Sequence, residues 1–68
     1  MDERVLLTLK KIRNLRIEKK ITILELSNIT GISRSYIHYL ERGEKIPTIT
    51  VLYKLADAFE VDIKQLFP

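Results

Sequence analysis

The sequence predicts a single all-α domain of five helices. Apolar residues recur at intervals of three and four over most of the chain, as they do on the buried face of a helix. Residues that favour helix N-caps stand directly before three of these periodic segments, at Thr22, Ser33 and Thr48. No segment alternates in the manner of a strand, and 68 residues leave room for one hydrophobic core.

The first helix is expected from about Asp2 to Lys19. Acidic residues open it and lysines close it, which suits the helix dipole. Its apolar stripe consists of Val5, Leu9, Ile12 and Leu15.

The second helix follows Thr22, because Thr22 and Glu25 have the spacing of a capping box. It should end near Thr30, where Gly31 can adopt a left-handed conformation. A third helix is expected after the cap Ser33; it covers about Arg34 to Arg42 and is terminated by Gly43.

Two further helices complete the prediction. Thr48 caps the fourth, whose inward residues are expected to be Ile49, Leu52, Leu55, Ala56 and Phe59. Asp62 and Gln65 form a second capping box. It opens a short fifth helix with the apolar residues Ile63, Leu66 and Phe67.

Composition and charge narrow the class of protein. Hydrophobic residues make up 46% of the chain, which indicates a packed core. The count of 0 Cys and 1 His rules out disulfides, a thiol nucleophile and the usual zinc ligand sets, so we expect no metal, no cofactor and a reducing cytoplasm. The N-terminus resembles neither a signal peptide nor a membrane span.

Basic residues are unevenly distributed, with a formal net charge of +3. That net charge is weak evidence for a nucleic-acid partner, but the placement predicts a basic face. The residues concerned are Lys10, Lys11, Arg13, Arg16, Lys19 and Lys20 in the first third and Arg34, Arg42 and Lys45 in the middle.

The segment from Thr22 to Gly43 predicts a helix-turn-helix, since two short helices joined by a four-residue turn cross steeply and let the second enter the major groove of DNA. The side that packs against the other helices is apolar: Leu26, Ile32, Ile37 and Leu40. The opposite side of the third helix can form hydrogen bonds: Arg34, Ser35, His38 and Tyr39.

From about Val5 to Phe67 the chain resembles the lambda repressor and Cro-like (XRE-type) helix-turn-helix proteins of phages and bacteria. The matching features are Leu26 with Ser27, Gly31, Ile37, the run from Leu40 to Gly43, Pro47 with Thr48, and the closing run from Val61 to Phe67. The resemblance implies one compact five-helix DNA-binding domain over residues 1–68. It further implies a transcriptional regulator, with repression expected, in a bacterial or phage-encoded protein of the cytoplasm and nucleoid.

In that family the recognition helix reads bases, and the corresponding residues here are Ser33, Arg34, Ser35 and Tyr39, with His38 and Tyr36 beside them. Arg34 is the first candidate, because a guanidinium can bond both O6 and N7 of guanine, worth about 1–3 kcal/mol of discrimination. Tyr36 and Tyr39 can contact a thymine methyl or donate to a phosphate. For Tyr36, packing against the first helix is an equal alternative.

Phosphate contacts are expected from Arg42, Lys45 and the N–H groups around Thr22 and Ile23, where the helix dipole favours an anion. The alternative for the two cations is an ordinary basic loop. The family often has a glutamine in place of Ile23, so that side-chain contact is lost or replaced.

Arg16 lies on the apolar stripe of the first helix, where an unpaired arginine is costly. Glu41 lies on the inward side of the third helix, and the resemblance implies that the two form a partly buried, architectural ion pair. Lys20 stands where the family commonly has Gly. The bend there either avoids a positive φ or accepts a cost of about 1 kcal/mol.

Partners follow mainly from the resemblance. Related repressors pair across two half-sites about 10 base pairs apart, so we expect a homodimer on a palindromic operator in double-stranded DNA. The interface is expected at the fifth helix and the loop before it. Leu66 and Phe67 either join the core or form a separate apolar patch.

Two other functions are compatible with parts of the sequence. An antitoxin-like adaptor, with a protein partner, is favoured by Ile17, Ile23 and Ile29, which have no clear place in a monomer core. An enzyme could be built from Ser35, His38 and Glu41, but Glu41 is better explained by Arg16 and no oxyanion donors are evident. We therefore expect no enzymatic activity.

Overall fold

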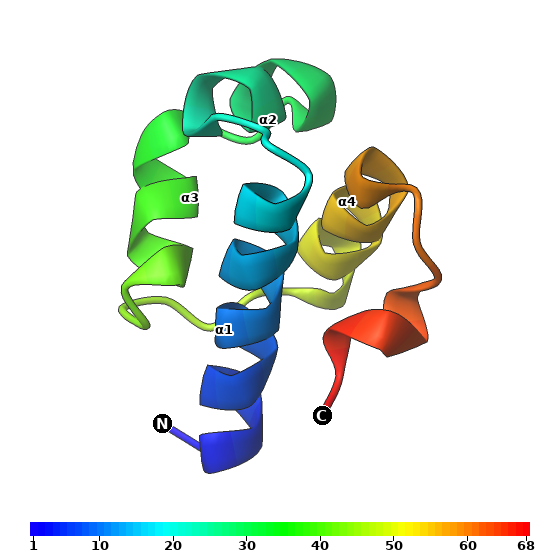
Figure 1. Ribbon diagram of the computed structural model, residues 1–68. Helices are drawn as coiled ribbons and strands as arrows, with labels where there is room; N and C mark the ends of the chain where they lie inside the picture. The colour runs from blue at the N-terminus through cyan, green and yellow to red at the C-terminus, as the bar shows by residue number, and fades with distance from the viewer.

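The computed structural model describes residues 1–68 and contains helices only (Figure 1). They are α1 (Glu3–Glu18), α2 (Ile23–Thr30), α3 (Arg34–Glu41), α4 (Ile49–Phe59) and the 3₁₀ helix η1 (Ile63–Leu66). The all-α prediction is confirmed, whereas the count of five α-helices is wrong, since the last helix is a single 3₁₀ turn.

The last helix is a 3₁₀ helix and not an α-helix, because its backbone hydrogen bonds span three residues instead of four. The Asp62 carboxylate accepts from the N–H of Lys64 at 3.0 Å, so no capping box with Gln65 forms. The backbone N–H of Gln65 donates to the Asp62 carbonyl, and that of Phe67 donates to the Lys64 carbonyl, at 2.9 and 3.2 Å. Both bonds span three residues, which is the 3₁₀ pattern.

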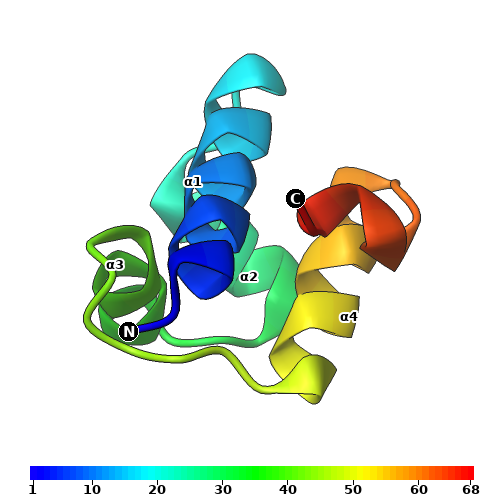
Figure 2. The same ribbon diagram turned by 90° about the horizontal axis from the view of Figure 1, so that it is seen from below.

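Helix α1 is the centre of the arrangement. It packs against α3, α4 and η1, while α2 packs against α3 and α4. Figures 1 and 2 show α3 on one side of α1 and α4 with η1 on the other. Helix α3 thus has one side packed against the rest of the domain and the other side exposed.

One apolar core joins all the helices. Its eleven buried members are Leu9, Ile12, Leu26, Ile32, Ile37, Leu40, Leu52, Leu55, Ala56, Phe59 and Leu66. Ile49 was expected among them but is 57% exposed. At 100° per residue it lies about 70° from the middle of the buried face of α4, at the edge of the stripe. Ile23 was expected to have no clear place in the core of a monomer, but it is half-buried and packs on the core.

The predicted helix boundaries are marked by the caps. The Thr22 hydroxyl accepts from the N–H of Glu25 at 3.0 Å, and the Glu25 carboxylate accepts from the N–H of Thr22 at 3.2 Å, so the capping box is confirmed. Gly31 has a φ of 75° at the end of α2, as expected. Ser33 and Thr48 cap α3 and α4.

Helix α1 ends at a residue other than glycine in the left-handed region. Lys20 has a φ of 57°, and two backbone bonds close a Schellman motif around it. The Lys20 N–H donates to the Ile17 carbonyl and the Ile21 N–H to the Arg16 carbonyl, both at 3.0 Å. The chain therefore accepts the strain of a positive φ at this bend.

Lys20→Gly is expected to stabilise the protein by about 1 kcal/mol relative to Lys20→Ala, because only glycine removes the clash of Cβ with the backbone. Both variants lose the same charge, so their difference isolates the backbone effect. Urea unfolding followed by circular dichroism measures it. Equal midpoints for the two variants would show that the bend is not strained.

Candidate nucleic-acid interface

The turn between α2 and α3 is held by side-chain hydrogen bonds. The Ser27 hydroxyl donates to the Ile32 carbonyl at 2.6 Å. The Thr30 hydroxyl donates to the Leu26 carbonyl at 2.7 Å and accepts from the N–H of Ile32 at 3.1 Å. These bonds, together with buried Leu26 and Ile32, fix the angle at which α3 leaves the turn.

Helix α3 has a buried side and an exposed side. Ile37 and Leu40 are each 1% exposed and belong to the core. The exposed side carries the expected groove-facing residues, which are Ser33 at the cap and Arg34, Ser35, His38 and Tyr39 on the helix. Arg34 is the first residue of α3 and forms no ion pair in the structure. Its guanidinium is thus available to a ligand.

Two of the candidate base readers have a structural role as well. The Ser33 hydroxyl accepts from the N–H of Tyr36 at 3.2 Å, which leaves its own O–H free to donate. Tyr36 is half-buried and packs against the core. Of the two alternatives for Tyr36, the structure therefore contains the packing contact.

The start of α2 retains free backbone donors. The capping box uses the N–H groups of Thr22 and Glu25. The N–H groups of Ile23 and Leu24 belong to the first turn, which has no intrahelical acceptors. They lie at the positive end of the helix dipole, where an anion is favoured.

The two expected phosphate-binding cations gather around one aromatic ring. The Arg42 guanidinium carbon lies 5.2 Å from the centroid of the Tyr39 ring, and the Lys45 ammonium nitrogen lies 6.0 Å from it. Arg42 also forms an exposed ion pair with Glu44, with 3.0 Å between Nη2 and Oε2. Glu44 was missed by the sequence reasoning, although its position just after Arg42-Gly43 was a usable signal.

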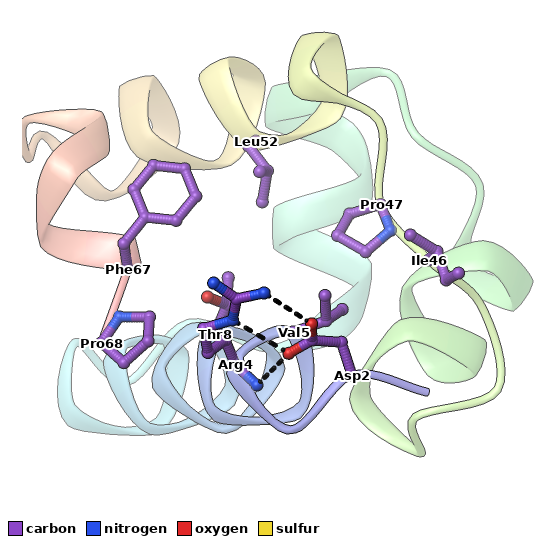
Figure 3. Close-up of a pocket in the computed structure, with 9 residues that line it drawn as sticks. All are labelled: Asp2, Arg4, Val5, Thr8, Ile46, Pro47, Leu52, Phe67 and Pro68. Carbon is purple, nitrogen blue, oxygen red and sulfur yellow. Dashed lines mark hydrogen bonds and ion pairs between the residues drawn. The ribbon is translucent and has the colours of Figure 1, made fainter.

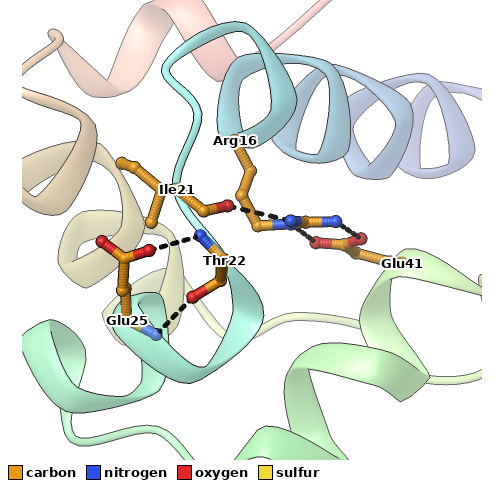
Figure 4. A network of polar contacts seen from close by, with 5 residues as sticks. All are labelled: Arg16, Ile21, Thr22, Glu25 and Glu41. Carbon is orange, nitrogen blue, oxygen red and sulfur yellow. Dashed lines mark hydrogen bonds and ion pairs between the residues drawn. The ribbon is translucent and has the colours of Figure 1, made fainter.

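On the inner side of α3, Arg16 of α1 reaches Glu41, the last residue of α3 (Figure 4). Arg16 Nε donates to Oε2 at 2.7 Å and Nη2 to Oε1 at 3.0 Å, while Nη1 donates to the carbonyl of Ile21 at 2.9 Å. The two side chains are only 14% and 5% exposed. The implied ion pair is therefore present, and it ties α1, the bend before α2, and α3 together.

The ion pair with Arg16 also engages Glu41, one of the three residues of the alternative catalytic set Ser35, His38 and Glu41. Both carboxylate oxygens of Glu41 accept from Arg16, whereas Ser35 and His38 are exposed on the outer side of α3. The structure does not bring the three together. No group of three or more His, Cys, Asp or Glu side chains is placed to hold a metal ion.

An open hollow of about 420 Å³ lies where the start of α1, the α3–α4 loop and the C-terminal residues meet (Figure 3). Leu52 points into it from α4, and Ile46 and Phe67 at its edge are 66% and 41% exposed. At its rim the Asp2 carboxylate accepts from Arg4, which holds the pKa of Asp2 below its ordinary value. Of the region where the dimer interface is expected, which is the fifth helix and the loop before it, only Phe67 lines this hollow.

Ile17 and Ile29, which the sequence offers as contacts for a protein partner, lie on other parts of the surface. Ile17 on α1 and Ile29 on α2 are 51% and 60% exposed. Ile29 borders a shallow hollow with Lys54 and Asp57 of α4. None of the helices combines the length and the apolar composition that crossing a bilayer requires.

Known proteins are similar to this chain in sequence and in fold. The helix-turn-helix family HTH_3 matches residues 12–66. An HTH-type transcriptional regulator of Sinorhizobium fredii is 42% identical over 52 residues, which are 76% of this chain and 68% of that protein. Another from Archaeoglobus fulgidus is 35% identical over 84% of this chain and 81% of its own length.

Solved structures agree. The restriction-modification controller protein C.AhdI of Aeromonas hydrophila superimposes with a TM-score of 0.85 at 30% identity, covering 91% of this chain and 96% of the controller. An HTH_3 family transcriptional regulator of Vibrio cholerae gives 0.82 at 27% identity, over 93% of this chain but 35% of that protein. The chain therefore belongs to the HTH_3 (XRE-type) helix-turn-helix family and is a transcriptional regulator with a helix-turn-helix DNA-binding fold.

Proposed function

We propose that the protein binds double-stranded DNA sequence-specifically, with α3 in the major groove, and acts as a repressor. The observation that carries this proposal is the exposed polar side of α3, backed by a rigid turn and a buried core. Repression is the role that the resemblance to the lambda repressor and Cro-like proteins implies.

Within this proposal, bases are read by Ser33, Arg34, Ser35 and His38, which share the exposed side of α3. Tyr36 has a smaller part, because its ring packs on the core. The phosphate backbone is bound by Arg42, Lys45 and the first N–H groups of α2 around Thr22 and Ile23. Tyr39 lies on α3 beside the proposed phosphate-binding residues, since Arg42 and Lys45 both lie over its ring.

A homodimer on a palindromic operator completes the proposal. The support is the apolar hollow beside η1, whose exposed Ile46 and Phe67 offer a surface that a second copy can cover. Two copies related by a twofold axis would place their α3 helices on half-sites about 10 base pairs apart. The similarity to C.AhdI, a restriction-modification controller protein, is compatible with a regulatory role.

The test is selection from a pool of random duplexes, followed by a salt titration on the enriched duplex. We expect one enriched, twofold-symmetric motif, and an affinity whose logarithm falls with the logarithm of salt concentration by about 0.9 per phosphate neutralised. A reporter gene with the motif across its promoter then separates repression from activation. No enrichment from the pool would contradict the proposal.

The second candidate is an adaptor that binds a protein partner. Exposed Ile17 and Ile29 favour it, because they lie outside both the core and the proposed DNA surface. It predicts that Ile29→Ser abolishes binding to that partner without changing duplex affinity. The two functions can coexist, since the surfaces are different.

A further inference from the structure

The C-terminal end of α3 carries a compact cluster of charged side chains around Tyr39. Tyr39 is 40% exposed, and the Arg42 guanidinium and the Lys45 ammonium lie over its ring, at 5.2 and 6.0 Å from the centroid. A cation within about 6 Å of an aromatic face is attracted by the ring electrons. The ring therefore brings two cations, three residues apart in sequence, to one place on the surface.

The backbone keeps this cluster in shape. Gly43, with a φ of 74°, closes α3 by a Schellman motif. Its N–H donates to the Leu40 carbonyl at 3.0 Å, and the Glu44 N–H donates to the Tyr39 carbonyl at 2.8 Å. A Cβ on Gly43 would lie 3.2 Å from the Leu6 side chain, so the turn also packs against α1. Glu44 and Lys45 are thus held next to the helix end.

Glu44 is the one anion of the cluster. A single oxygen, Oε2, lies 3.1 Å from Nε and 3.0 Å from Nη2 of Arg42. Both side chains are about half exposed, at 51% and 56%. A phosphate oxygen can accept from the same two nitrogens, because a guanidinium recognises carboxylate and phosphate with the same fork of donors.

We propose that Tyr39, Arg42 and Lys45 form a single phosphodiester-binding site whose guanidinium the Glu44 carboxylate occupies in the free protein. DNA has to displace Glu44 to bind there, so Glu44 lowers affinity for every sequence by the same factor. Tyr39 is then a positioning residue for the two cations and leaves base selection to the start of α3. This inference rests on the proposed DNA-binding function and names one of its contacts and the group that competes for it.

The first test replaces Glu44 by Gln and compares it with Glu18→Gln. Both variants lose one negative charge, but Glu18 makes no ion pair and borders a hollow with Lys11 and Gln65, on the η1 side of α1. Dissociation constants are measured for the selected duplex and for a scrambled duplex over a range of salt concentrations. We expect Glu44→Gln to bind both duplexes about 2- to 5-fold more tightly, in line with the strength of an exposed ion pair. The salt slope should steepen by up to about 0.9.

Glu18→Gln should stay close to the unsubstituted protein in both measurements. If the two variants are indistinguishable, the competing role of Glu44 is overturned while the DNA-binding function stands. If the unsubstituted protein shows no salt-dependent binding to any duplex, the DNA-binding function fails and this site with it. A gain limited to the selected duplex would also overturn the inference, because it would make Glu44 a determinant of sequence.

The second test addresses the ring. Tyr39→Phe keeps the aromatic face and should retain affinity, salt slope and sequence preference. Tyr39→Leu removes the face and should weaken binding to both duplexes about 2- to 5-fold, with a shallower slope, as the two cations lose their common support. Thermal unfolding establishes that both variants fold. A changed order of preferred duplexes in Tyr39→Phe would assign Tyr39 to the bases and overturn its positioning role.

Discussion

Glu41→Gln is expected to lower the free energy of unfolding by about 3–5 kcal/mol, because it leaves the Arg16 guanidinium without a counter-charge in a site that is only 14% exposed. A single core in a chain this small rarely supplies more than about 3–5 kcal/mol in total. The variant should therefore be largely unfolded at 25 °C. Circular dichroism with urea titration, or with heating where the baseline permits, measures the loss.

Two controls separate the buried pair from ion pairs in general. Glu44→Gln breaks the exposed pair with Arg42 and should change stability by less than about 1 kcal/mol. The double variant Arg16→Met/Glu41→Leu removes both buried charges and should recover much of the stability that Glu41→Gln loses. If Glu41→Gln unfolds within about 0.5 kcal/mol of the unsubstituted protein, the pair is not a structural element.

The position of this pair also separates stability from recognition. Arg16 Nη1 donates to the Ile21 carbonyl directly before the Thr22 cap, and its partner Glu41 is the last residue of α3. The pair thus fixes both ends of the helix-turn-helix from the inner side and faces away from the exposed side of α3. Arg16→Ala should accordingly reduce the folded fraction while the remaining folded molecules keep the same preference among duplexes.

Features encoded by a few neighbouring residues could be predicted from the sequence. The capping box of Thr22 and Glu25 and the left-handed Gly31 depend on contacts within one or two turns, and both are present as expected. The long-range pair of Arg16 with Glu41 was implied by the family resemblance together with the cost of an unpaired arginine on an apolar stripe. Its 25-residue separation is beyond any local pattern.

Features decided by tertiary packing could not be predicted from periodicity. Ile49 continues the spacing of the α4 stripe, but it lies at the edge of the buried face and is 57% exposed. Tyr36 and Ile23 are half-buried on the edge of the core, a state that spacing alone does not distinguish from full exposure. The contact of the Glu44 carboxylate with Arg42 depends on the turn at Gly43, although the closeness of the two residues in sequence already allowed it.

Arg34→Ala is expected to lower affinity for the selected duplex by roughly 5- to 150-fold, which corresponds to the loss of a bidentate contact to guanine worth about 1–3 kcal/mol. Arg34 begins α3, is exposed and forms no ion pair, so stability should not fall. The side chain is a cation at the positive end of a helix, and its removal can even be slightly favourable for folding. Competition between the selected duplex and duplexes with single guanine replacements measures the effect.

The decisive quantity is the ratio of affinities for the selected and scrambled duplexes. Arg34→Ala should bring this ratio close to that of non-specific binding. At one position of the motif, replacing guanine by another base should then no longer change the affinity. Arg42→Ala, the control, should weaken both duplexes alike and reduce the salt slope by about 0.9, since a phosphate contact carries no direct sequence information. If Arg34→Ala instead behaves like Arg42→Ala, the guanidinium at the start of α3 binds the backbone, and base reading must rest on Ser33, Ser35 and His38.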